Sequence, residues 1–159
     1  MGLVGISLGS NLGDRLGNLR TAVARLQEVQ SSGHLLLSSV YETDPVGCPP
    51  GSGSFYNAVI EIETELSPHD LLRTTKAIEK ALGRPSAREI NAPRTVDLDL
   101  LYYGEMVLSD GDLVLPHPRM GERAFVLMPL AEIRPDLVPD QWKSEPFPQG
   151  IRRLSEDTL

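Results

Sequence analysis

Cysteine is nearly absent from this sequence: Cys48 is the only one, so no internal disulfide can form. We therefore expect a protein of a reducing, cytoplasmic compartment. No run of about 20 apolar residues occurs, and this argues against a membrane-spanning helix. The start, Met1-Gly2-Leu3, has no basic segment of the kind that opens a secretory signal, so we expect none.

Positive charge and aromatic side chains are also scarce. Lys and Arg number 15 against 22 Asp and Glu, which gives a formal net charge of −7, and aromatic residues make up only 5%. A negative field repels nucleic acid and anionic lipid, so we expect neither as a partner, and an anion site must be a local basic cluster. The remainder is ordinary, with 40% hydrophobic and 23% charged residues, and predicts one globular domain over 1–159.

Strand and helix patterns alternate from the start of the chain. Leu3–Leu8 is a short apolar run that predicts a buried strand. Apolar residues at spacings of three and four from Arg15 to about Gln30 predict a helix, with Asp14 as its N-cap and Gly33 as its end. A second strand is expected over Leu35–Glu42.

The middle of the chain begins with residues 43–54, whose three prolines and three glycines predict a surface loop. Phe55–Glu65 alternates, with Ala58, Ile60 and Ile62 on one side and Asn57, Val59 and Glu61 on the other, which predicts a half-exposed strand. Ser67 followed by Pro68 predicts the N-terminus of a helix that ends at Gly83.

The last third contains the strongest strand pattern, Thr95–Tyr103, with Leu98, Leu100 and Tyr102 on one face. A tight connection at Gly104-Glu105 leads to apolar residues 106–108. A helix is expected over Glu122–Glu132, which Pro129 must kink or end. From about Arg134 the tail is expected to be irregular. The order of elements predicts an α+β fold with a sheet layered by helices.

Two acidic residues interrupt the strand pattern at Asp97 and Asp99. Residues two apart on a strand project from the same face, roughly 7 Å apart. Neighbouring carboxylates repel unless a cation lies between them, and an oxygen-only ligand set suits Mg²⁺ completed by substrate phosphates. The alternative is a pair of ordinary solvated charges on an exposed face.

Basic residues gather just before this strand, although the chain as a whole is acidic. Arg84, Arg88 and Arg94 lie within eleven residues, and Lys76 and Lys80 precede them. Guanidinium groups bind phosphate oxygens in a fork geometry. Together with the aspartate pair, this cluster favours metal-assisted phosphoryl transfer, and the alternative is a solvated basic loop.

Other candidates stand near these clusters. His117 lies between Pro116 and Pro118, where it would either contact a phosphate or serve only as a structural loop residue. Phe55 stands at the end of the Pro/Gly loop beside polar Asn57, an arrangement suited to stacking a flat heterocycle and binding its edge. The alternative for Phe55 is a place in the core.

In this order, these segments resemble the 6-hydroxymethyl-7,8-dihydropterin pyrophosphokinases of folate biosynthesis over roughly residues 3 to 133. The matching segments are Gly9-Ser10-Asn11-Leu12-Gly13, Tyr41-Glu42-Thr43-Asp44-Pro45-Val46-Gly47, Phe55-Tyr56-Asn57-Ala58, Gly83-Arg84, Pro93-Arg94-Thr95-Val96-Asp97-Leu98-Asp99, Pro116-His117-Pro118-Arg119-Met120 and 123–130. The run from Pro93 to Asp99, followed by Pro-His-Pro, is the most specific of them.

The resemblance implies a ferredoxin-like α+β fold and transfer of pyrophosphate from ATP to a pterin hydroxymethyl group with release of AMP. It implies two Mg²⁺ ions held by Asp97 and Asp99, and catalytic roles for both aspartates and for Arg84 and Arg94. The implied ATP-binding residues are Lys76, Glu79, Arg84, Arg94, His117 and Arg123. The implied pterin-binding residues are Thr43, Pro45, Val46, Phe55, Asn57 and Phe125.

The chain departs from the family pattern before Pro93. Ser86 stands where many members have a second arginine, and Ile90-Asn91-Ala92 replaces a basic–aromatic–glycine triplet. We expect weaker closure of the arginine-rich loop from these changes and the same reaction. The alternatives are a non-catalytic pterin-binding module and an RNA-binding module, which the net charge disfavours. We expect a monomer that is able to associate with other folate enzymes.

Overall fold

The computed structural model describes residues 2–44, 53–83, 96–139 and 150–154. The elements in chain order are β1 (Gly2–Ser10), α1 (Arg15–Gln27), β2 (Leu35–Leu37), β3 (Tyr41–Thr43), β4 (Phe55–Thr64), α2 (Pro68–Ala81), β5 (Asp97–Tyr103), β6 (Leu108–Asp110), β7 (Leu113–Leu115), η1 (Met120–Glu122), α3 (Ala124–Ile133), η2 (Pro135–Leu137) and β8 (Ile151–Arg153).

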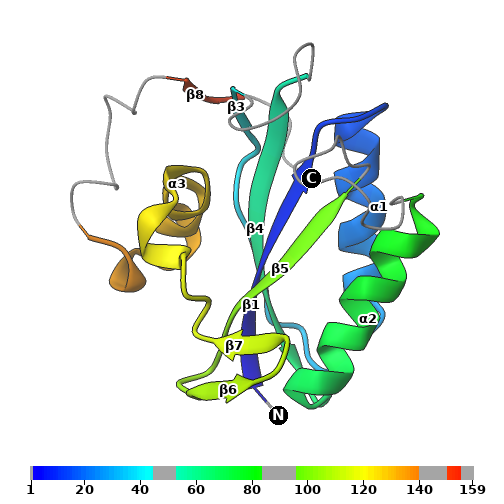
Figure 1. Ribbon diagram of the computed structural model, residues 1–159, viewed down its shortest axis with the longest axis vertical. Helices are drawn as coiled ribbons and strands as arrows, with labels where there is room; N and C mark the ends of the chain where they lie inside the picture. Colours follow the sequence, from blue (N-terminus) through cyan, green and yellow to red (C-terminus); the bar gives the residue numbers. More distant parts are fainter. Residues whose placement is uncertain (1, 45–52, 84–95, 140–149, 155–159) are drawn as a thin grey trace.

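One antiparallel sheet organises these elements in the order β5-β1-β4-β3-β8, with β2 pairing to β4 beside β3. Helices α1 and α2 cover one face, and α3 covers part of the other (Figure 1). The larger core lies under α1 and α2, and a smaller one lies between the sheet and α3. The expected α+β class and the antiparallel sheet are confirmed.

The predicted helix N-termini are confirmed by their caps. The Asp14 carboxylate accepts a hydrogen bond of 3.0 Å from Gly17 N, and the Ser67 hydroxyl accepts one of 3.2 Å from Asp70 N. Gly83 follows α2 with φ at 91°, as a helix end requires. The prediction that the first helix ends at Gly33 is wrong. Helix α1 ends at Gln27, six residues earlier, in a turn in which Glu28 N donates a hydrogen bond to Arg25 O.

The strand expected over Leu35–Glu42 is two strands, β2 and β3, with a break at Ser38. The Ser38 side chain accepts a hydrogen bond from Val59 N and donates one to Ser39 O. A hydroxyl that takes a ladder position interrupts the regular pairing, and this competition of side chain with backbone is a feature that hydrophobic periodicity does not detect.

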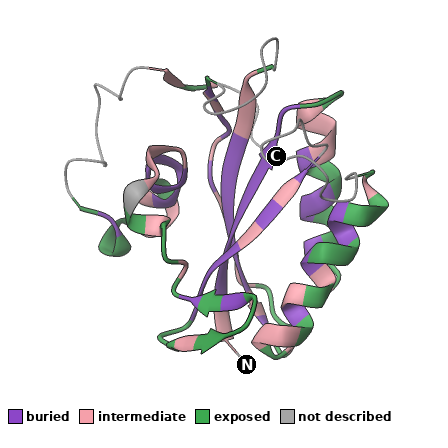
Figure 2. Cartoon of the chain, viewed as in Figure 1, coloured by how far each residue is buried: buried purple, intermediate pink, exposed green. Residues whose placement is uncertain are grey.

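The expectation of a half-exposed β4 is wrong. Asn57, Val59 and Glu61 project opposite the larger core, yet they are only 4%, 0% and 1% exposed. Figure 2 shows β4 buried along most of its length. The cause is tertiary: α3 packs on this second face with Val126, Leu127 and Leu130, and a strand covered on both faces leaves even its polar positions buried.

A bulge in β5 corrects the predicted placement of Tyr102. Gly5 pairs with Tyr102 and Ile6 pairs with Leu100, so Leu101 is an extra residue in β5. After the bulge, Tyr102 lies in the α3-side core rather than with Leu98 and Leu100. An extra residue reverses the inward and outward alternation, which the apolar pattern alone did not indicate.

Gly5 is expected to be essential for this arrangement, because a Cβ built on Gly5 would overlap the ring of Tyr102. We expect Gly5→Ala to destabilise the protein by about 1–3 kcal/mol through overpacking. Gly33→Ala is the matched control, since a Cβ at Gly33 has no neighbour within 4 Å. Urea unfolding measures both variants, and equal midpoints for the two would contradict the expectation.

The C-terminal third differs from the expectation in three places. Residues 108–115 form a hairpin, β6–β7, beyond the predicted 106–108 run. Helix α3 continues past Pro129 to Ile133, and the burial of Met128, Pro129 and Leu130 holds this turn in place although Pro129 has no N–H. The tail is not wholly irregular, because β8 pairs with β3.

Among the residues that the structure describes, no helix is long and apolar enough to cross a membrane.

Candidate active site

The candidate site lies on the α3 side of the sheet, where apolar side chains give way to polar ones toward the start of β4. The strand register places Asn57, Gly9 and Asp97 in one row across β4, β1 and β5, and Val59, Ser7 and Asp99 in the next row. Strands are spaced about 4.8 Å apart, so roughly 10 Å separates the backbones of Asn57 and Asp97. Asn57 of the predicted pterin set and the two predicted metal ligands therefore lie on one face of the sheet.

Gly9 forms the floor between these two groups. A Cβ there would lie 3.0 Å from Asn57 Oδ1 and 3.9 Å from Phe55 Cδ1, so a side chain would crowd the pterin-side residues. The absence of a side chain at Gly9 lets the Asn57 side chain lie close to the β1 backbone. Sequence reasoning did not assign Gly9 a role, because only the register reveals that it stands between Asn57 and Asp97.

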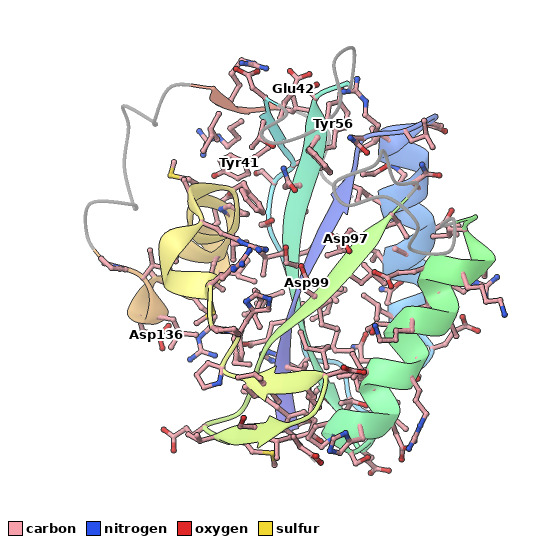
Figure 3. The ribbon with its side chains drawn as sticks, in the orientation of Figure 1. Tyr41, Glu42, Tyr56, Asp97, Asp99 and Asp136 are labelled. Carbon is pink, nitrogen blue, oxygen red and sulfur yellow. The ribbon has the colours of Figure 1, made fainter. Side chains whose placement is uncertain are left out.

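Asp97 and Asp99 are both half-buried on β5, and Figure 3 shows them along this strand. Arg123 Nη1 lies 3.9 Å from Asp99 Oδ2, so a predicted nucleotide-side residue stands next to a predicted metal ligand. The arginine comes from the segment that precedes α3, and the structure thus brings together residues that are 24 positions apart in the chain.

His117 belongs to the same neighbourhood. The backbone N–H of His117 donates a hydrogen bond of 2.8 Å to Leu101 O, and its ring Nδ1 accepts one of 3.1 Å from the backbone N–H of Arg119. Burial lowers the pKa of His117 below its usual range, with Asp99 opposing the shift and Arg123 reinforcing it. The His117 ring is therefore held by the backbone and favoured in its neutral form, and it interacts electrostatically with both the acidic pair and the nearby arginines.

The donor set fits a magnesium ion in part. Asp97 and Asp99 offer carboxylate oxygens from one face of a half-buried strand, which are the ligands that Mg²⁺ prefers. Within the described ranges, no group of three or more His, Cys, Asp or Glu residues lies together as a complete metal cage. Mg²⁺ is commonly bound by one or two carboxylates, with substrate phosphates and water as its other ligands, rather than by a cage of protein ligands alone.

Three of the predicted pterin-side residues, Thr43, Phe55 and Asn57, lie close together where β3 ends and β4 begins. Asn57 Nδ2 donates a hydrogen bond of 2.8 Å to Thr43 Oγ1, and both side chains are buried. Phe55 pairs with Thr43 in register. Phe125 lies in the first turn of α3, with the Arg123 guanidinium 5.6 Å from its ring centre. The stacking of a pterin between the two phenylalanines stays a prediction.

Two predicted ATP residues lie on α2, which packs on the other face of the sheet (Figure 1). Lys76 is exposed. Glu79 is only 6% exposed, and its Oε2 accepts a hydrogen bond of 2.8 Å from Leu98 N, the amide between the two aspartates. Glu79 thus supports the backbone of the edge strand β5, and its contact with ATP stays a prediction.

Pro45, Val46, Arg84 and Arg94 lie outside the described residues, as do the departures at Ser86 and 90–92. Their assigned roles stay predictions.

The comparison with a protein-family model first gives the class: the match covers residues 5–135 and places the chain among the pyrophosphokinases. The chain belongs to the 7,8-dihydro-6-hydroxymethylpterin-pyrophosphokinase family, as the resemblance implied. The family region contains every residue that was assigned to the site from the sequence.

Curated relatives agree with this assignment. The chain is 45% identical over 148 residues to the 2-amino-4-hydroxy-6-hydroxymethyldihydropteridine pyrophosphokinase of Bacillus subtilis, a match that covers 92% of this chain and 87% of that protein. It is 39% identical to the folic acid synthesis protein FOL1 of Dictyostelium discoideum over 86% of this chain, but only 20% of that longer protein.

Solved structures extend the likeness to the fold. A Plasmodium falciparum HPPK-DHPS triple mutant with pteroate superimposes with a TM-score of 0.65 over 96% of this chain and 46% of that chain, at 13% identity. An HPPK-DHPS in complex with substrates gives a TM-score of 0.61 at 14% identity, over 89% of this chain and 41% of that one. This chain thus spans less than half of either bifunctional protein.

Proposed function

We propose that this chain transfers the β,γ-diphosphoryl group of ATP to the hydroxymethyl group of 6-hydroxymethyl-7,8-dihydropterin in folate biosynthesis. The substrate hydroxyl oxygen bonds to the β-phosphorus and gives up its proton to water, the bond from this phosphorus to the α,β-bridging oxygen breaks, and AMP leaves. The observation that carries the proposal is the shared surface: the carboxylate pair of β5 and the Asn57–Thr43 pair face the same side of the sheet across Gly9.

We assign the site roles to residues of this surface and of the segments next to it and, for Lys76 and Glu79, to α2 on the other face of the sheet. On the pterin side we assign binding to Thr43, Pro45, Val46, Phe55, Asn57 and Phe125. On the nucleotide side we assign binding to Lys76, Glu79, Arg84, Arg94, His117 and Arg123. We assign metal binding to Asp97 and Asp99, with two Mg²⁺ ions, and catalytic roles to both aspartates and to Arg84 and Arg94.

Each of these side chains contributes by its position and its charge, because phosphoryl transfer requires little covalent chemistry from the protein. Mg²⁺ held by Asp97 and Asp99 would neutralise charge on the phosphate oxygens. Arg123, near Asp99, adds positive charge on the same side. The Asn57–Thr43 pair would offer fixed polar atoms to the edge of a heterocycle, and a side chain at Gly9 would crowd Asn57.

The fold and the state of the molecule are part of the same proposal. The order β1-α1-β2/β3-β4-α2-β5 and the sheet order β5-β1-β4-β3 support a ferredoxin-like arrangement. We further propose that residues 1–159 act as one domain, as a monomer in the cytoplasm that is able to associate with other folate enzymes. The single cysteine supports that location.

A direct assay tests the function. The protein is incubated with ATP, Mg²⁺ and the reduced pterin, and nucleotides are separated by chromatography. We expect AMP and the pterin diphosphate in equal amounts, with none when the pterin is omitted. Release of ADP would contradict the reaction, and tight pterin binding without AMP would instead favour the non-catalytic module.

A further inference from the structure

A second polar cluster lies directly behind the pterin-side residues, on the α1 face of the sheet. Glu42 and Tyr56 pair across β3 and β4, and Figure 3 shows them near one end of the sheet. Tyr56 packs against the larger core, which lies on the α1–α2 face. Because side chains alternate along a strand, Thr43, Phe55 and Asn57 project to the opposite face.

Arg15, the first residue of α1, is the centre of this cluster. Its Nη1 donates to Ser54 O at 3.0 Å and to Ser54 Oγ at 2.8 Å. Its guanidinium lies over the Tyr56 ring, 4.0 Å from the centroid, and its Nη1 is 3.8 Å from Glu42 Oε2. A planar guanidinium holds a hydroxyl, a carbonyl and a ring at once, which a more flexible ammonium does less well.

Glu42 closes the cluster. Its carboxylate accepts a hydrogen bond of 2.7 Å from Ser54 Oγ, and Arg152 Nε of β8 lies 3.3 Å from its other oxygen. The hydrogen bond from Ser54 lowers the pKa of Glu42 against the effect of burial, and Arg152 and Arg15 add to the shift. The carboxylate is therefore ionised at neutral pH and holds α1, β3 and β8 together.

Arg15 contacts Ser54 and Glu42, and each of these two residues directly precedes a pterin-side residue in the sequence. Ser54 is followed by Phe55, and Glu42 is followed by Thr43, which pairs with Phe55 in register. Thr43 in turn accepts the hydrogen bond of Asn57. A shift of Ser54 or Glu42 would thus move the groups on the other face.

We propose that Arg15 is a positioning residue for the pterin side of the site: by holding Ser54 and Glu42, it sets where Phe55 and Thr43 stand. This inference rests on the proposed function for the identity of the ligand. Arg15 does not belong to the substrate-binding set, and it acts through the strand ends.

The test compares dissociation constants for the reduced pterin, measured by calorimetry with saturating non-hydrolysable ATP analogue, and for the analogue alone. We expect Arg15→Ala to raise the pterin constant about five- to tenfold and to leave the analogue constant within about twofold. Arg15→Lys should recover part of the loss, since an ammonium still donates to Ser54 but lacks the flat fork.

Arg20→Ala is the matched control, because Arg20 is an exposed arginine of the same helix, and it should leave both constants unchanged. Should Arg15→Ala fail to fold, Ser54→Ala decides: it removes the hydroxyl between Arg15 and Glu42 and should raise the pterin constant about threefold. An unchanged pterin constant, or an equal rise for both ligands, would overturn the proposal. Binding is measured independently of AMP formation, so a failure of the proposed reaction gives a different result.

Discussion

Asp97→Ala is expected to lower the rate of AMP formation by about 10²- to 10³-fold. The charge stabilisation supplied by a bound metal is worth several kcal/mol, and each 1.4 kcal/mol changes a rate tenfold. Asp97 lies in the row with Gly9 and Asn57, on the same face of the sheet as the predicted pterin-binding Asn57. The measurement is AMP released over a titration of Mg²⁺.

The controls separate charge from structure. Asp97→Asn keeps the size of the side chain and removes its charge, so its rate should fall nearly as far as that of the alanine variant. Asp112→Ala changes an exposed aspartate in the β6–β7 turn and should leave the rate unchanged. If Asp97→Ala keeps more than a tenth of the wild-type rate with a normal requirement for Mg²⁺, Asp97 does not hold the metal.

Glu61→Ala is expected to give the largest loss of stability, about 3 kcal/mol in the free energy of unfolding. Glu61 is 1% exposed, and its carboxylate lies 2.5 Å from the Tyr102 hydroxyl, 2.6 Å from Arg134 Nη1 and 2.7 Å from His34 Nε2. Removal of the carboxylate takes the buried acceptor from the Tyr102 hydroxyl and leaves Arg134 with the exposed Asp136 as its remaining ion-pair partner. Breaking a buried ion pair costs about 3–5 kcal/mol. Arg134 is 26% exposed, and this favours the lower part of that range.

Urea unfolding checks this value, with Glu65→Ala as the control. Glu65 is exposed one residue beyond the same strand, so its loss should change stability by less than about 0.5 kcal/mol. The slope of the free energy against urea should remain constant if the variant changes stability alone. Equal midpoints for Glu61→Ala and the wild type would show that the network contributes nothing.

The same carboxylate predicts a pH dependence. Burial raises the pKa of Glu61, but the hydrogen bonds from Tyr102, His34 and Arg134 outweigh burial and lower it below the usual value. A carboxyl group with a lowered pKa in the folded state stabilises the fold fully above the unfolded pKa of about 4.3. This stabilisation is lost as the pH falls through the folded pKa. We therefore expect the stability difference between wild type and Glu61→Gln to shrink in that acidic range, by urea titrations at successive pH values.

The candidate site shows which of its residues pattern reasoning can identify. Asp97 and Asp99 were recognised because acids at a spacing of two stand out in an apolar strand, and Asn57 because it follows a Pro/Gly loop. Gly9 belongs to a segment that matches the family but was assigned no role, and Arg15 was not singled out, because a single helix arginine shows no pattern that indicates one. Gly9 lies between Asn57 of β4 and Asp97 of β5, and Arg15 contacts Ser54, which is 39 positions away.

Local chemistry along the chain determined the helix starts at Asp14 and Ser67, the principal strands and the position of the carboxylate pair. These depend on side chains hydrogen-bonding to nearby backbone groups or on short-range alternation, which a linear sequence contains in full. Only the tertiary structure decided that Glu61 is buried, that Tyr102 changes face and that β8 joins the sheet. These features are caused by the packing of α3 on the second face of the sheet and by pairing between distant strands. Such contacts join residues that are far apart in the sequence, so no local sequence pattern predicts them.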